Sequence, residues 1–274
     1  MSKDPFRHLC VALGVIAVTL VFFSPRLWLM TDEKPGTFVW DRANTFLSQV
    51  EDPFRTDIES AMKWRIAPPL VAKILHLNGK SAFFIPWIGA VILLAYVSDL
   101  IRSKSQDWKF TIAATLIVAT TSAVMVPLHW YGINDSWIWL GLLVVTFSQN
   151  RTLLVASVLL APWVDERFII GLPLALLSRQ IGGSHSKRKF EWWLLLGLLP
   201  YILIRIAMGG NPINGETERT FIATHLADST RRVGLAPLAW WMGLRIAWIP
   251  VGYFVKTLKS KDQILLLAIG APTV

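Results

Sequence analysis

Long apolar runs recur along the whole chain, and they constrain its fold more than any other feature. Of the 274 residues, 54% are hydrophobic and only 16% are charged. A soluble domain needs polar positions to face water, and runs of this length and frequency leave too few of them. The sequence therefore predicts an all-α polytopic membrane protein with about eight or nine transmembrane helices.

The expected spans follow the apolar runs between charged or turn-forming segments. A helix that crosses perpendicular to the bilayer needs roughly 20 apolar residues, and the fourth, fifth and sixth runs are shorter than this. The first helix is expected to be uncleaved and to run to about Met30. The runs are His8–Phe23, then 83–101, 110–129, 137–147, 152–164, 168–177, 192–208 and 238–255, and a ninth that starts at Gln263 and is expected to be truncated at Val274.

Basic residues orient the predicted spans. The net charge is +9, and the cationic residues fall mainly in short connectors between apolar runs, which is typical of cytoplasmic loops. The N-terminus, the connector 102–109 and the segment 178–189 are therefore expected in the cytoplasm. No nucleic-acid recognition motif accompanies the charge, so binding to nucleic acid is not expected.

Counting crossings from a cytoplasmic N-terminus places the acidic segments outside. The single transmembrane domain, 1–274, then has two external loops, 31–80 and 209–237. Carboxylates are costly at the centre of a membrane helix, so acids at the ends of short helices should border water. A half-buried polar cleft is expected on this side. Its acids are Asp135, Asp165 and Glu166, together with Asp32, Glu33, Asp41, Glu51, Asp52, Asp57 and Glu59 of the first loop.

The first external loop has its own helical pattern. Apolar positions in 38–50 recur near the helical period, which predicts an amphipathic helix at the membrane interface. A turn is expected at Asp52–Pro53 and a helix over 56–64. Pro68 and Pro69 should then interrupt the chain before a further helix.

The sequence lacks the signature motifs of several enzyme classes. The chain has no phosphate-cradling Gly-rich loop, no His-Glu-x-x-His and no Gly-x-Ser-x-Gly, which argues against an ATPase, a zinc protease and a serine hydrolase. The single cysteine, Cys10, excludes an internal disulfide framework.

Four segments, in this order, carry a resemblance to a known family. They are DPF through KWRIAPPLVAKIL (52–75), INDSWIWLGLLVVTF (133–147), VDERFIIGLPLALL (164–177) and LLPYILIRIAMGG (198–210). Their order resembles the GT-C superfamily of membrane glycosyltransferases, in an uncharacterised bacterial branch, over roughly Asp32 to Gly210. The resemblance implies a bacterial inner-membrane protein of the cell envelope. It would transfer a sugar from a polyprenyl-phosphate carrier to a glycan or lipid acceptor at the external face.

The resemblance implies a catalytic carboxylate in the first external loop. This group would deprotonate or orient the acceptor hydroxyl. Asp41 is favoured, and the pair Asp32–Glu33 follows closely. In the family a helix with aromatic residues usually follows an acidic pair, whereas here the segment 34–36, Lys-Pro-Gly, intervenes.

Arginines are the candidates for the leaving phosphate, since a guanidinium group can bind phosphate oxygens through two hydrogen bonds. These candidates are Arg65, Arg205, Arg231 and Arg232. Asp135 and Glu166, with Asp165 beside them, would line the cleft and orient the acceptor or an optional divalent metal ion. No cofactor is certain.

Each site residue also has a simpler interpretation. Arg205 can extend from its helix end to the membrane interface, and Arg231–Arg232 can be ordinary loop charge. Asp165, Glu166 and Arg167 can form a solvated turn in which Arg167 neutralises an acid. The alternative function is a non-enzymatic polytopic protein, either a transporter or a subunit for envelope assembly.

Overall fold

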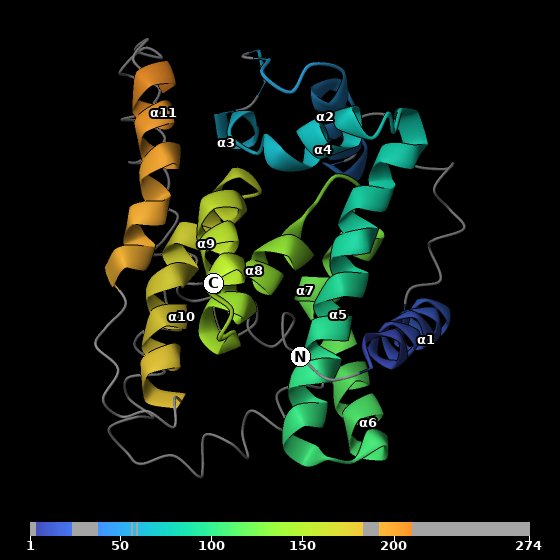
Figure 1. Ribbon diagram of the computed structural model, residues 1–274. Helices are drawn as coiled ribbons and strands as arrows, with labels where there is room; N and C mark the ends of the chain where they lie inside the picture. Colours follow the sequence, from blue (N-terminus) through green and yellow to red (C-terminus); the bar gives the residue numbers. More distant parts are fainter. Residues whose placement is uncertain (1–3, 24–37, 56, 59, 183–191, 210–274) are drawn as a thin grey trace, which may run out of the picture.

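The described part of the chain is helical throughout. The computed structural model describes residues 4–23, 38–55, 57–58, 60–182 and 192–209, and no strand occurs in these ranges (Figure 1). The all-α prediction is therefore confirmed for them. The α-helices are α1 (Pro5–Phe23), α2 (Phe38–Glu51), α3 (Ser60–Lys63), α4 (Ala67–Ile74), α5 (Phe84–Ser105), α6 (Trp108–Ala119), α7 (Ser122–His129), α8 (Asp135–Phe147), α9 (Arg151–Leu160), α10 (Arg167–Gly182) and α11 (Leu199–Gly209). Three 3₁₀ helices join them: η2 (Gly79–Phe83), η3 (Ala161–Trp163) and η4 (Trp192–Leu198).

Two helices in the described residues are long and apolar enough to cross a membrane. They are Pro5–Phe22 within α1 and Gly79–Ser105, which joins η2 to α5. A third candidate arises if α6 and α7 form one broken span, bent by 58°. These three match the first three predicted spans. The expected extension of the first helix to Met30 and the predicted spans after 238 lie outside the described residues.

The fourth, fifth and seventh predicted spans are short apolar helices in the structure, and the sixth lies in α10 (Arg167–Gly182). Asp135–Phe147, Arg151–Trp163 and Trp193–Ala207 each have 10–17 residues. α10 begins one residue before the predicted run and extends to Gly182. The seventh begins as the 3₁₀ helix η4 and becomes α-helical at Leu199.

The bend between α6 and α7 has a local cause. The hydroxyl groups of Thr120 and Thr121 donate to the carbonyls of Ile117 and Val118, each at 2.7 Å. Such bonds compete with the helical backbone pattern and bend helices. Pro127, inside α7, also removes one backbone donor.

Side-chain contacts show which helices run in the same direction. Nδ1 of His8, near the start of α1, lies 2.9 Å from Oγ of Ser98, near the end of α5. The indole of Trp137, near the start of α8, donates to the carbonyl of Ile85, near the start of α5, at 3.0 Å. Arg179, late in α10, donates to the carbonyl of Ser148 after α8. α5, α8 and α10 therefore run in the same direction, and α1 crosses beside α5 (Figure 1).

A helical layer covers the end at which α5, α8 and α10 begin. We call α2, α3, α4 and η2 the cap (Figure 1). The predicted amphipathic helix is present as α2, and its apolar face packs against protein. Phe46 and Phe83 stack with ring centroids 5.9 Å apart, and Phe83 meets Tyr131 at 4.8 Å. The contact with Tyr131 anchors the cap to the loop before α8, and η2 continues directly into α5.

The rest of the cap differs in detail from the predicted pattern. The helix expected over 56–64 is described only as the single turn α3. Pro68 and Pro69 do not interrupt a helix but lie in the first turn of α4. Proline is tolerated there because the first backbone N–H groups of a helix have no partner within it.

Gly132 is the tightest point between the cap and the bundle. Its φ is +76°, and a Cβ added there would lie 2.6 Å from Cβ of Phe46. We expect Gly132→Ala to lower the free energy of unfolding by about 2–4 kcal/mol, through left-handed strain and overpacking. Chemical unfolding in detergent micelles would measure this loss.

Gly79→Ala is the matched control, since Gly79 has a φ of +54° and an added Cβ would have nothing within 4 Å. Strain alone should cost about 1–2 kcal/mol there. Equal losses for the two variants would show that contact with Phe46 adds nothing.

Candidate functional site

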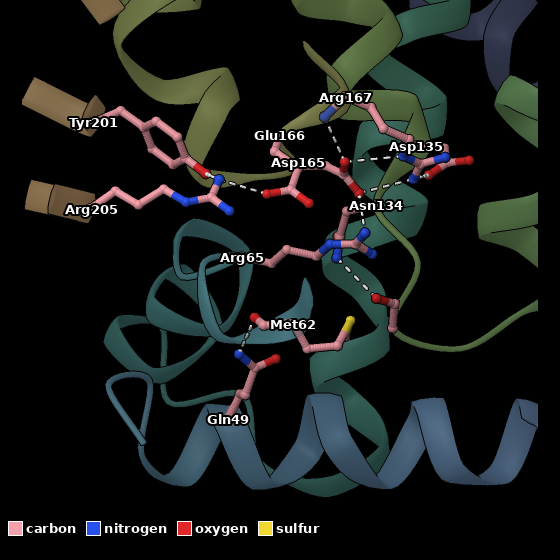
Figure 2. Close-up of polar contacts among 11 residues, drawn as sticks. Gln49, Met62, Arg65, Asn134, Asp135, Asp165, Glu166, Arg167, Tyr201 and Arg205 are labelled. Carbon is pink, nitrogen blue, oxygen red and sulfur yellow. Dashed lines mark hydrogen bonds and ion pairs between the residues drawn. The ribbon is translucent and has the colours of Figure 1, made fainter. Parts of the chain in front are cut away.

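Asp165 lies at the centre of a charged cluster where the cap meets the bundle. Its side chain is 3% exposed, and its Oδ2 lies 2.8 Å from Nη2 of Arg65. Its two oxygens also accept from Nε and Nη2 of Arg167, at 3.0 and 2.9 Å. Figure 2 shows the two guanidinium groups on either side of this carboxylate.

Local sequence explains the position of Asp165. It precedes α10 by two residues, and its Oδ1 accepts the backbone N–H of Arg167 at 2.9 Å. An acidic side chain that caps a helix N-terminus is favoured by the unpaired backbone donors and by the helix dipole. Asp165 is thus both the cap of α10 and the centre of the cluster.

Arg167 links Asp165 to the start of α8. Its Nη2 donates to Oδ1 of Asp135, at 2.5 Å. Asp135 is the first residue of α8, so its charge is also favoured by the helix dipole. One guanidinium group therefore joins the N-terminal ends of two parallel helices.

The cap supplies Arg65 from the short segment between α3 and α4. Its neighbours Trp64 and Ile66 are buried at 8% and 6% exposure, which fixes the backbone on both sides. Gln49 of α2, fully buried, donates to the carbonyl of Met62 at 2.9 Å (Figure 2). The direction of Arg65 is therefore set by packing within the cap.

A second group of side chains lies beside the first and is more exposed. Nη1 of Arg205 in α11 donates to Oε2 of Glu166 at 2.7 Å and to the hydroxyl of Tyr201 at 2.9 Å. Arg205 also lies over the ring of Trp64, 5.5 Å from its centroid. The two groups are joined through the chain itself. Trp64, in the second group, precedes Arg65 of the first, and Glu166, in the second group, follows Asp165 of the first. Together they form one continuous network.

Burial and charge act against each other at the centre of this network. For Asp165, burial alone would raise the pKa, but the hydrogen bond from Arg167 and the charge of Arg65 outweigh it and hold the pKa below its usual range. For Arg65, burial lowers the pKa and Asp165 opposes it, while Arg167 and Arg42 lower it further. Asp165 is therefore firmly ionised, and Arg42 acts on the same site.

The structure brings together five of the residues selected from the sequence: Arg65, Asp135, Asp165, Glu166 and Arg205. Asp41 lies on α2 in the cap, and its side chain is outside the described part. Asp32, Glu33, Arg231 and Arg232 lie outside the described residues altogether. The alternative interpretation of this segment as a solvated turn holds in part: Arg167 pairs with Asp165 as expected, but the Asp165 side chain is buried and not solvated. Arg205, which could have extended to the interface alone, is paired with Glu166.

Four contributors were not selected from the sequence as site residues: Arg42, Arg167, Tyr201 and Trp64. Tyr201 stands four residues before Arg205, a spacing that places both on one helix face and could have indicated the pair. Trp64 gave no comparable signal. Its ring lies beneath Arg205, which is 141 positions later in the chain (205 − 64), and only folding brings the two together. Trp163 then packs against Tyr201 edge-on, with centroids 5.0 Å apart.

The arrangement suits the binding of an anion better than the binding of a metal ion. Among the described residues, no group of three or more His, Cys, Asp or Glu could hold a metal ion. Each carboxylate of the network already accepts hydrogen bonds from an arginine. The side chains of Arg167 and Arg205, by contrast, are 52% and 43% exposed.

Comparison with known protein families, curated proteins and solved structures gives no match. The site is defined by its own geometry: arginines and carboxylates from four chain segments, at one end of a helical bundle with two or three candidate membrane spans.

Removal of the central carboxylate should be costly. We expect Asp165→Asn to lower the free energy of unfolding by about 3–5 kcal/mol, because it leaves Arg65 without its counter-ion and Arg167 with only one of its two carboxylate partners. Thermal unfolding of the purified protein in detergent would measure it. Asp57→Asn, which neutralises an exposed carboxylate paired with Arg55, is the control and should leave stability unchanged.

Acid should weaken the same interaction. Because the pKa of Asp165 is lowered in the folded state, its contribution is complete above the ordinary carboxyl pKa of about 3.9 and is lost as the pH falls through the folded value. The difference in melting temperature between wild type and Asp165→Asn should therefore be constant near neutral pH and shrink below about pH 4. A difference that stayed constant down to pH 3 would contradict this role of Asp165.

Proposed function

We propose that the protein is a membrane glycosyltransferase of the GT-C type, which uses a polyprenyl-phosphate-linked sugar at the external face of a bacterial inner membrane. One observation carries the proposal: arginines and carboxylates from distant segments meet at one end of the bundle. Among the described residues, Arg65, Arg167 and Arg205 meet Asp135, Asp165 and Glu166 there. The side chains of Arg167 and Arg205 are partly exposed and can present N–H donors to an anionic ligand.

The chemistry of sugar transfer from a lipid phosphate matches this charge pattern. As the glycosidic bond to phosphate breaks, negative charge grows on the leaving group, and fixed guanidinium groups stabilise it. The described carboxylates serve the arginines by holding them in place. The acceptor hydroxyl then needs another carboxylate as base, and the first loop supplies Asp41, Asp32 and Glu33.

The proposed topology assigns the cap to the external side. The opposite end of α5 leads into Arg102, Lys104 and Lys109, and Arg179 lies near the end of α10. Cationic residues of this kind favour the cytoplasm. We therefore propose a cytoplasmic N-terminus and eight or nine spans, in which the short helices α8 and α9 with η3 cross within the bundle.

Substitution of the first-loop acids tests the catalytic assignment. We expect Asp41→Asn to abolish transfer of the sugar, with Asp32→Asn and Glu33→Gln as the competing candidates. Mass analysis of lipid-linked sugars and glycan products, in cells that lack the native gene and make each variant, would show it. Glu51→Gln, which neutralises an exposed acid at the end of α2, is the matched control and should retain activity. Full activity in all three variants would exclude these acids as the base.

Labelling from each side of the membrane tests the topology. In a Cys10→Ser background, cysteines placed at Asp57 in the cap and at Ser105, the last residue of α5, should react from opposite sides. A membrane-impermeant maleimide added to intact spheroplasts should label the first and spare the second. Labelling of both, or of Ser105 alone, would contradict the proposed orientation.

A non-enzymatic role in transport or envelope assembly is the second candidate. The observation that favours it is that every described site carboxylate is paired with an arginine, as expected of a network that only holds the cap in place. On this alternative Asp165→Asn should impair the protein through stability alone. On the proposed function, Asp41→Asn should impair a stable protein.

A further inference from the structure

We infer that Arg205 is the residue that binds the phosphate group of the ligand, and that Glu166 competes with that phosphate as an internal counter-ion. The inference deepens the proposed function and rests on it for the choice of a lipid-linked phosphate. It follows from a comparison of how the three arginines of the network use their hydrogen-bond donors.

Arg205 has an unused edge. A guanidinium group carries five N–H donors in a planar fork. In Arg205 both side-chain bonds, to Glu166 and to Tyr201, come from Nη1. Nε and Nη2 make no hydrogen bond within the described residues, and together they form the edge that binds two oxygens of a phosphate in parallel.

The other two arginines have no such edge. Nε and Nη2 of Arg167 are bound to Asp165, and Nη2 also reaches Asp135. Nη2 of Arg65 pairs with Asp165, and its Nε is buried. A phosphate could bind the Nε–Nη2 edge of Arg167, or Nη2 of Arg65, only by displacing the almost fully buried carboxylate of Asp165. Separation of a buried pair is far more costly than that of an exposed one.

The pair of Arg205 and Glu166 is much easier to open. Their side chains are 43% and 34% exposed, and an ion pair of this kind contributes little net stability. Glu166 places a carboxylate on the guanidinium group, as an anionic ligand would. It therefore reduces the attraction for a phosphate without closing the free edge.

Aromatic rings hold Arg205 in this position. Trp64, which is buried, lies under the guanidinium group at 5.5 Å, and the ring of Tyr201 lies at 5.8 Å. Cation–π contacts of this kind orient an arginine without using its N–H donors. The free edge is thus kept available while the group itself is fixed.

The outer face of α11 indicates the source of the phosphate. Ile202, three residues before Arg205 and on the same side of α11, is 40% exposed, and Leu199, Leu203 and Ile206 continue the exposed apolar surface around the helix at 46%, 61% and 67%. Such an apolar surface suits an alkyl chain in a membrane. A phosphate at Arg205 with its chain along α11 would be a lipid phosphate rather than a free one.

Binding of octyl phosphate to the purified, full-length protein tests the inference without turnover. We expect Glu166→Gln to bind it about two- to fivefold more tightly than wild type, as removal of a partly exposed competing charge predicts. Arg205→Gln should bind octyl phosphate about tenfold more weakly than wild type, or weaker still. The affinity of Arg205→Lys should lie between those of wild type and Arg205→Gln. Isothermal titration calorimetry in detergent would give the dissociation constants.

Two controls separate a specific site from general attraction. Asp57→Asn adds the same charge as Glu166→Gln at another exposed ion pair and should leave binding unchanged. Octanol, which lacks the phosphate, should not distinguish wild type from Arg205→Gln. Equal gains in Glu166→Gln and Asp57→Asn, or no loss in Arg205→Gln, would overturn the assignment.

Inorganic phosphate is the second probe. Weaker binding than octyl phosphate, with the same ranking of variants, supports a lipid phosphate, whereas equal binding would overturn the role of α11. The proposed glycosyltransferase activity is tested separately from the phosphate site. Binding that follows the expected ranking, in a protein whose Asp41, Asp32 and Glu33 variants all remain active, would leave the phosphate site standing and remove the catalytic assignment.

Discussion

The contact between Asp165 and its two arginines is the interaction on which the rest of the site depends. Arg65 comes from the cap and Arg167 from the bundle, and the carboxylate between them is almost fully buried. A buried charge is tolerated only when it is paired and hydrogen-bonded. Arg167 meets part of this condition from within the bundle and Arg65 completes it from the cap, so the same contact links the cap to the bundle.

The network combines a rigid part with an exchangeable one. Arg167 bridges the first turns of α8 and α10, where both carboxylates are also favoured by helix dipoles. Arg205 and Glu166 lie farther out, on α11 and at the start of α10, and are open to solvent. A site that must bind and release an anion needs both properties: fixed donors that do not reorganise, and one counter-ion that can be replaced.

Much of the architecture was predictable from the periodicity and length of the apolar runs. The positions of α5, of α8 and of the amphipathic helix α2 follow from local pattern, because each apolar run is bounded by residues that begin or end a helix. The bend between α6 and α7 and the start of α4 at Pro68–Pro69 were not predicted. In both places hydroxyl groups or prolines act through backbone hydrogen bonds, which a hydropathy pattern does not record.

The sequence by itself determined the helical class, the candidate spans and the residue types of the site, since these depend on composition and on spacing along the chain. It also selected Arg65, Asp135, Asp165, Glu166 and Arg205 as members of one site. Only the tertiary structure decided which charges pair, and hence that Asp165 holds the cap while Arg205 keeps a free edge over Trp64. Pairing depends on distances and burial between segments far apart in the chain, and these arise only when the helices pack.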